Sequence, residues 1–122
     1  MPRFALLEHT GAPDDPTGRH VDLLVEDGDQ CRTWRLADVP LADGPAVTAL
    51  EIAPHRLDWL DHVDGPVSDG RGHARRIDSG TCRLVTHRGD ALIEIGSGPT
   101  AVFLRIGDGA CIATRGQPEW PF

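Results

Sequence analysis

Short apolar runs separated by glycine and proline dominate the pattern of hydrophobic and polar positions along the chain. The clearest run is His20-Val-Asp-Leu-Leu-Val-Glu26. In a β-strand successive side chains point to opposite faces, so this run has one apolar and one mixed face. The apolar face carries Val21, Leu23 and Val25. The other face carries His20, Asp22, Leu24 and Glu26. We predict a strand whose apolar face packs on a core while the His/Asp face looks into a cleft or solvent.

Comparable runs recur along the rest of the chain. They predict strands at residues 4–8, 30–36, 46–52, 73–78, 81–87, 91–96, 100–106 and 110–114. Asp27-Gly28-Asp29 and Arg88-Gly89-Asp90 are typical of hairpin turns, and Arg56–Asp61 is predicted to form a single helical turn. Pro13–Gly18 and Leu41–Pro45 are predicted surface loops. Fourteen glycines and ten prolines at these intervals indicate an all-β sandwich or barrel.

Length and composition add limits to this picture. The chain has 122 residues, which fits one domain over 1–122, and 39% hydrophobic with 25% charged residues is ordinary for a soluble protein. No apolar run approaches the roughly 20 residues that span a bilayer, and no signal peptide is evident, so we expect a cytoplasmic protein without membrane contact. Cys31, Cys82 and Cys111 are odd in number and far apart, so we expect reduced, mostly core-facing thiols.

The formal net charge of -7 argues against nonspecific binding to nucleic acid, which relies on basic contacts to phosphates. The twelve basic residues are nevertheless all arginine, whose planar fork binds phosphate with two hydrogen bonds. Several cluster in sequence: Arg71, Arg75, Arg76 and Arg83. They form either a local phosphate-binding patch or ordinary pairs with nearby aspartates on exposed strands. Arg71 stands out because the glycines beside it let its backbone approach a ligand closely.

Three histidines and one aspartate are candidate metal ligands. The His-x-Asp spacing of His20 and Asp22 lets both side chains reach a common point, and imidazole with carboxylate suits manganese, iron or zinc. His9 and His55 each follow an apolar, strand-like run. A metal site formed by these four residues is one interpretation. The other is that the six histidines are scattered at loop starts, where they only titrate.

Six short segments, in order over roughly residues 3–84, resemble the 3'-phosphoesterase domain of bacterial DNA ligase D, and more closely its small free-standing relatives. The segments are Leu7-Glu8-His9, His20–Glu26, Arg32-Thr-Trp-Arg-Leu36, His55-Arg-Leu-Asp-Trp-Leu60, Gly65-Pro-Val-Ser-Asp-Gly-Arg-Gly72 and Ile77-Asp-Ser-Gly-Thr81. The resemblance implies a small β-barrel and a manganese ion, with Zn²⁺ or Co²⁺ as alternatives. It also implies the ligands: His9, His20, Asp22 and His55.

The chain departs from the family pattern in three places. Leu24 stands where the family strand carries an arginine for substrate phosphate, which predicts weak or absent phosphatase activity and a gain on Leu24→Arg. The connection Thr10–Arg19 is several residues longer than in the family. The stretch His55–Gly65 is one residue longer, so that His62 is an alternative to His55 as the ligand.

By resemblance the function is metal-dependent hydrolysis of 3'-phosphate or 3'-ribonucleotide ends of DNA, a phosphatase or phosphodiesterase activity in DNA repair, with DNA-repair proteins as potential partners. Arg71 or Arg76 would balance charge as the ester bond breaks, and His73 or His62 would protonate the leaving oxygen. One alternative is a noncatalytic, metal-stabilised barrel that binds a nucleic-acid end or a protein. Another is a structural domain without metal.

Trp34 and Trp59 are candidates for base stacking, although core packing is favoured for both. The two prolines of the tail Gln117–Phe122 exclude regular structure there, and Trp120 is expected to pack on the barrel.

Overall fold

The computed structural model of the chain describes residues 1–116 and is almost entirely β-structure. The described residues form β1 (Arg3–Thr10), β2 (Arg19–Asp27), β3 (Gln30–Leu36), β4 (Val47–Arg56), β5 (Asp64–Pro66), β6 (His73–His87), β7 (Asp90–Ile95), β8 (Val102–Gly107) and β9 (Ala110–Arg115). Two 3₁₀ helices, η1 (Leu57–Asp61) and η2 (Gly98–Thr100), complete the elements. The helical turn predicted at residues 56–61 is confirmed as η1. Neither described helix is long and apolar enough to cross a membrane.

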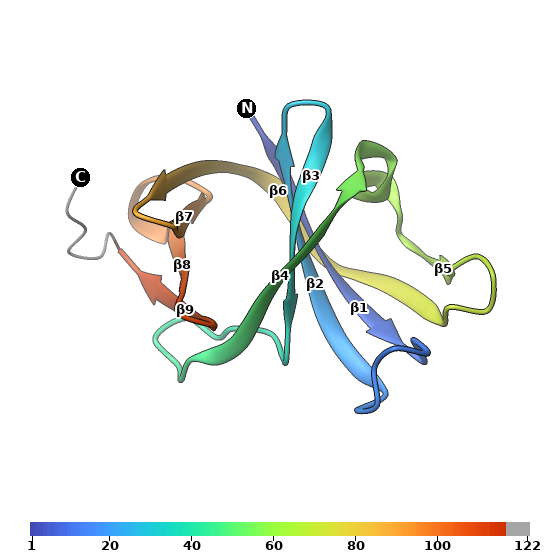
Figure 1. Cartoon of the computed structure of the whole chain (residues 1–122). Coiled ribbons are helices and arrows are strands. Elements are labelled where there is room, and N and C mark those ends of the chain that lie inside the picture. The colour runs from blue at the N-terminus through green and yellow to red at the C-terminus, as the bar shows by residue number, and fades with distance from the viewer. Residues whose placement is uncertain (117–122) are drawn as a thin grey trace.

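The strands form one antiparallel sheet that closes into a ring (Figure 1). Strand order is β1-β2-β3-β4-β9-β8-β7-β6-β5, and β1 also pairs with β6. The long strand β6 closes the ring because residues 73–81 pair with β1 while residues 82–87 pair with β7. Only Val47 and Thr48 join β4 to β9. The predicted all-β, barrel-like fold is therefore confirmed.

Strand β6 differs from the expectation of two separate strands. Ser79 and Gly80 lie between the predicted runs, yet both pair with β1 inside one continuous strand. A Cβ at Gly80 would lie 3.3 Å from Cε1 of Phe4, so this glycine allows close packing of an aromatic ring. The glycine between the two predicted runs therefore marks a close contact and not a break between strands. Strand β5 was not predicted, and the expected packing of Trp120 falls outside the described residues.

Both predicted hairpin turns are confirmed. Asp27 pairs with Gln30 across Gly28-Asp29, and His87 pairs with Asp90 across Arg88-Gly89. Arg88 and Gly89 both have positive φ, the conformation that two-residue hairpin loops require.

The sheet buries a different apolar cluster on each face of its first three strands. The barrel core contains the odd-numbered residues of β2 predicted for it, together with their partners on the neighbouring strands: Phe4, Leu6, Val21, Leu23, Val25, Trp34 and Leu36. The second cluster lies on the opposite face: Ala5, Leu7, Leu24, Cys31 and Leu60, with Leu57 and Trp59 packed against it. The predicted two-faced pattern of β2 is thus confirmed, and Trp34 is a core residue. The second face is partly apolar, however, and supports the polar site described below.

The three cysteines are fully buried and their thiols are free. Burial raises the pKa of Cys31 to about 11, of Cys82 to about 11 and of Cys111 to about 12. The thiolate is the reactive form, so at about pH 8 the folded protein should react very slowly with an aromatic disulfide reagent. Denaturant should expose all three thiols to rapid reaction, measured by absorbance of the released thiolate. Fast reaction of any thiol in the folded protein would contradict its burial.

Candidate metal centre

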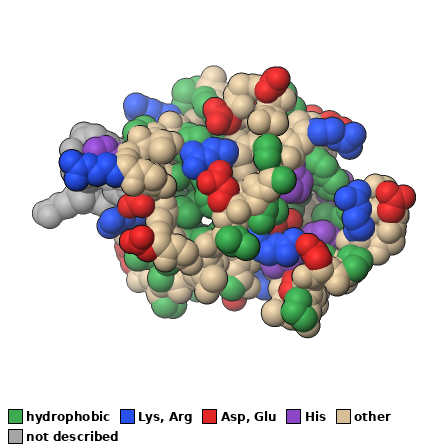
Figure 2. Space-filling view, viewed as in Figure 1, with side chains coloured by type: hydrophobic (Ala, Val, Ile, Leu, Met, Phe, Trp, Pro, Cys, Tyr) green, Lys and Arg blue, Asp and Glu red, His purple; other side chains and the backbone are tan. Residues whose placement is uncertain are grey.

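A cleft of about 330 Å³ lies on the face of β1–β4 that carries the second cluster. Its lining comes from β1, β2, β3, β4 and β6, from η1, and from the loops before β2 and β6: Leu7, His9, Ala12, Pro13, Asp14, Asp22, Arg35, Ile52, His55, Trp59, Val67, Arg71 and Ala74. On the side of the molecule that carries β5, histidine side chains lie in recesses between arginine and acidic side chains (Figure 2). The cleft therefore combines an apolar floor with a small number of polar groups, which is typical of a ligand site.

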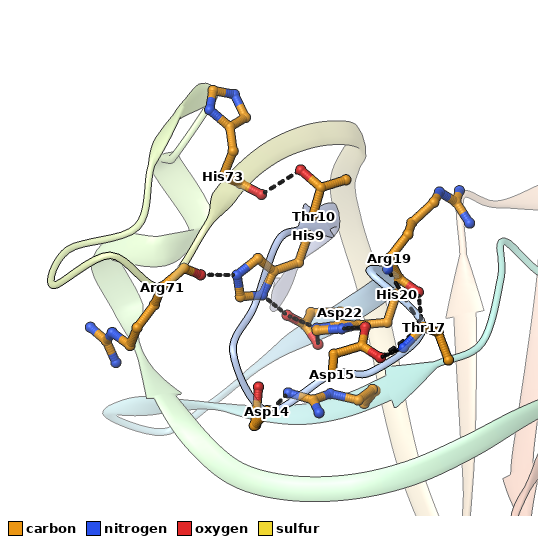
Figure 3. Close-up of polar contacts among 11 residues, drawn as sticks. His9, Thr10, Asp14, Asp15, Thr17, Arg19, His20, Asp22, Arg71 and His73 are labelled. Atoms are coloured by element: carbon orange, nitrogen blue, oxygen red, sulfur yellow. Dashed lines mark hydrogen bonds and ion pairs between the residues drawn. The ribbon is translucent and has the colours of Figure 1, made fainter.

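His9 enters the cleft from the end of β1. Its Nε2–H donates a hydrogen bond of 2.7 Å to the backbone carbonyl of Arg71 (Figure 3). The other ring nitrogen, Nδ1, faces Asp22, whose Oδ2 lies 3.6 Å away. Gly72 allows the Arg71 carbonyl to reach the ring, since a Cβ at Gly72 would clash with the carbonyl oxygen of Thr10. Gly72 therefore allows the backbone at Arg71 to lie close to the His9 ring.

His20 lies directly across from His9 in the register of β1 and β2 and is 3% exposed. Its Nδ1–H donates a 2.7 Å hydrogen bond to Oδ2 of Asp15. Asp15 accepts two further hydrogen bonds, from the backbone N–H and the hydroxyl of Thr17. The Thr17 hydroxyl and then the His20 ring lower the pKa of Asp15 to about 2, so this carboxylate is ionised and only accepts. The predicted loop at residues 13–18 therefore fixes one tautomer of His20.

The inner nitrogens of both imidazoles converge on the Asp22 carboxylate. One ligand atom from each of His9, His20 and Asp22 lies within 4.8 Å of the others. His20 Nε2 is 3.3 Å from each carboxylate oxygen of Asp22, and Asp22 Oδ1 is buried without a hydrogen-bond partner among residues 1–116. A neutral His20 would turn its Nε2 lone pair against this carboxylate. A proton or a cation between the two groups relieves that repulsion.

The proton alternative has support in the electrostatics of His20. Burial lowers the pKa of His20, but the hydrogen bonds to Asp22 and Asp15 outweigh burial and leave the pKa above its ordinary value. The metal alternative matches the donor set, because two imidazoles and one carboxylate on one side of an ion are a common arrangement for divalent transition metals. Each imidazole also donates its outer N–H to an acceptor, as histidine ligands of metals almost always do. The cluster therefore fits a divalent cation.

Removing the acceptor for His20 should weaken metal binding. Asp15→Asn keeps the side-chain shape but replaces the charged acceptor with a neutral amide that can also donate, so the preference for a proton on Nδ1 of His20 is weakened. Loss of such an orienting partner typically lowers metal affinity by about 10- to 100-fold. Calorimetric titration of Zn²⁺ into chelator-treated protein measures the change. Asp38→Asn, on an exposed carboxylate that pairs with Arg19, is the matched control and should leave the affinity unchanged.

His55, the fourth predicted ligand, lines the same cleft from β4 but lies outside the three-residue cluster. Its Nδ1 is 3.2 Å from the backbone carbonyl of Ala53. The alternative, His62, donates from Nε2 to the carbonyl of Ala74 at 2.8 Å and packs on Trp59. His62 does not line the cleft, so the structure brings His55 and not His62 to the candidate site. Trp59 lies between the two rings and forms part of the cleft wall.

Of the three residues predicted to take part in catalysis, only Arg71 lines the cleft. Its guanidinium donates to the carbonyl and hydroxyl of Ser68, both at 2.9 Å. Arg76 reaches the carbonyl of Leu60, and the His73 ring pairs with Asp64 and points away from His9 (Figure 3). His73 and Arg76 therefore do not join the candidate site.

Leu24 is on the same face of β2 as His20 and Asp22, as predicted, but it is fully buried in the second apolar cluster. It does not line the cleft. The gain expected on Leu24→Arg stays a prediction, and the burial of this position weighs against it, because the new side chain would lie among apolar residues.

Two residues of the site did not stand out from the sequence. Asp15 orients His20, and Arg35 lines the cleft directly across from Asp22 in the register of β2 and β3. The signal for Arg35 was its place in an alternating strand: Arg35 shares the face of Thr33 and Cys31, while Trp34 faces the barrel core.

Comparison of the sequence with protein-family models and with curated proteins gives no match.

Proposed function

We propose that His9, His20 and Asp22 hold a divalent transition-metal ion in the cleft. Two imidazoles and a carboxylate whose ligand atoms lie within 4.8 Å of one another support this proposal. The orientation of each ring by an outer acceptor, Arg71 carbonyl or Asp15 carboxylate, supports it further. Mn²⁺ is the ion that the family resemblance favours, and Zn²⁺ and Co²⁺ suit the same donors.

We further propose that the protein is a metal-dependent phosphoesterase acting on 3'-phosphate or 3'-ribonucleotide ends of DNA. The observation that carries this proposal is that the metal-ligand cluster opens on a cleft also lined by Arg35 and Arg71. A bound divalent ion polarises a phosphate oxygen and lowers the pKa of a bound water. Arginine supplies hydrogen-bond donors to the same oxygens. The resemblance to the ligase D phosphoesterase domain adds the identity of the substrate.

The size and charge of the molecule favour a chain end over a long stretch of nucleic acid. A cleft of about 330 Å³ is at the small end of ligand pockets and suits a terminal nucleotide. The net charge of -7 opposes contacts along an extended phosphate backbone. Trp59, half-buried on the cleft wall, offers an apolar surface to the sugar or base of that nucleotide.

The proposal is tested by phosphate release from a 3'-phosphate oligonucleotide, with a 3'-ribonucleotide substrate beside it. Protein treated with chelator and then loaded with Mn²⁺ should release phosphate, and the chelator-treated protein should not. His20→Ala should abolish release. His73→Ala, which removes a histidine outside the cleft, should retain it. Metal-loaded protein that cleaves neither substrate would refute the phosphoesterase.

The fully buried Leu24 in place of the family's arginine favours a second candidate function, a noncatalytic barrel whose metal site binds a nucleic-acid end or a protein partner. Metal binding without cleavage, combined with retention of the 3'-phosphate oligonucleotide, would establish this second function.

A further inference from the structure

Arg35 has a buried hydrogen-bond donor that no group of the described chain satisfies. Its Nε is buried and lacks a hydrogen-bond partner within residues 1–116, although its side chain as a whole is 27% exposed on the cleft wall. A buried N–H without an acceptor costs free energy comparable to a lost hydrogen bond, and a charged donor costs more. Because Nε is buried, an acceptor in the cleft reaches it only when a neighbouring side chain moves aside.

The single side-chain partner of Arg35 in the described chain is weakly placed. One Nη lies 3.3 Å from Oδ2 of Asp14, whose side chain is 71% exposed on the loop before β2. An exposed pair of this kind contributes little to stability, so a better acceptor can replace Asp14 without a large penalty. Asp14 is also next to Asp15, which orients His20. The Arg35–Asp14 pair is therefore beside the metal-ligand cluster.

The other arginines near the cluster already have two acceptors each. The guanidinium of Arg71 binds the carbonyl and hydroxyl of Ser68. Arg19 binds Glu8 and Asp38 at 2.8 and 3.1 Å. Arg35 lies directly across from the proposed ligand Asp22 in the register of β2 and β3. Arg35 is thus the cleft arginine whose Nε–H is buried without an acceptor in the described chain.

We propose that Arg35 is the phosphate-binding residue of the cleft, and that the terminal phosphate of the substrate displaces Asp14 from it. Two phosphate oxygens would accept from Nε and one Nη, the paired geometry that arginine offers and lysine does not. This inference rests on the proposed phosphoesterase function and names the residue that replaces the family arginine missing at Leu24. Arg35 lies on β3, the strand next to β2, directly across from Asp22.

The test is calorimetric binding of inorganic phosphate, at low concentration, to the Zn²⁺-loaded protein. Arg35→Gln should weaken phosphate binding by roughly 10- to 100-fold, the value of a charge-assisted hydrogen-bond pair. Arg35→Lys keeps the charge and should recover only part of the loss. Asp14→Asn removes the competing carboxylate and should tighten binding by about two- to fivefold. Zn²⁺ affinity, measured for each variant, should equal that of the wild type and shows that the variant is folded.

Arg32→Gln is the matched control, because it removes the same charge from the same strand. Arg32 pairs with Glu51 and lies over the Trp34 ring, outside the cleft, so phosphate binding should be unchanged. In the wild type, the Nε–H resonance of Arg35 should shift on addition of phosphate, a readout that needs no variant.

The outcomes separate this inference from the proposed function. Phosphate binding that is equal in wild type and Arg35→Gln, with no shift of the Arg35 resonance, would overturn the role of Arg35 and leave the phosphoesterase standing. Zn²⁺-loaded wild type that binds no phosphate would overturn both.

Discussion

Zn²⁺ or Mn²⁺ added to chelator-treated protein will raise the free energy of unfolding by about 2.7 kcal/mol when the free metal is 100 times its dissociation constant. The reason is that the ligands converge only in the folded chain. His9 and His20 are cross-strand partners in the β1–β2 register, and residues 11–18 form the loop between these strands. Unfolding separates the three ligands and loses most of the binding free energy. Denaturant titration with and without metal measures the difference.

Two variants control this result. Asp22→Asn preserves the shape of the buried side chain but removes its charge, so the metal-dependent gain should disappear. His62→Ala removes an imidazole that packs on Trp59 but does not itself line the cleft, so the gain should remain. His55→Ala decides whether the cleft histidine of β4 is a fourth ligand. We expect it to retain most of the gain, because His55 lies outside the three-residue cluster. If neither metal shifts the unfolding midpoint, the proposal that these residues bind a metal ion is wrong.

Leu24→Arg will lower the free energy of unfolding by about 3 kcal/mol or more, the cost of an unpaired charge in an apolar interior. Leu24 is completely buried and packs with Ala5, Leu7 and Leu60. An arginine there has no acceptor within the cluster and must either stay buried or push apart the floor of the cleft. Denaturant unfolding followed by tryptophan fluorescence gives the value, since Trp59 packs against this cluster.

Leu24→Met is the control, because a swap of similar volume in a core typically costs less than about 1.5 kcal/mol. If Leu24→Arg is as stable as the wild type and cleaves a 3'-phosphate faster, position 24 reaches the cleft and the assignment of phosphate binding to Arg35 is wrong.

The local pattern of the sequence was enough for most of the strands and for part of the site. Alternation along residues 20–26 placed Val21, Leu23 and Val25 in the core and put His20 and Asp22 together on the opposite face, as the structure has them. The two glycine-containing hairpin turns followed from turn chemistry alone. These features depend on residues that are close in sequence, so their pattern is directly visible.

The remaining parts of the site depend on contacts between distant segments. The Arg71 carbonyl reaches His9 across 62 residues, and neither the acceptor nor the tautomer that it selects is visible in a sequence. Arg35 faces the cleft because β3 pairs with β2 in one register, and a shift of one residue would turn it to the other face. His73 and Arg76 have the chemistry expected of a phosphate site but lie outside the cleft. Their placement depends on the long pairing of β6 with β1.

The central claim is that His9, His20 and Asp22 bind one metal ion in the cleft, and anomalous diffraction from crystals soaked in Zn²⁺ tests it most directly. The account predicts one strong anomalous peak in contact with Nδ1 of His9, Nε2 of His20 and the Asp22 carboxylate, with Asp15 still bound to the outer nitrogen of His20. No peak at these atoms, or a peak held by other residues, would contradict it.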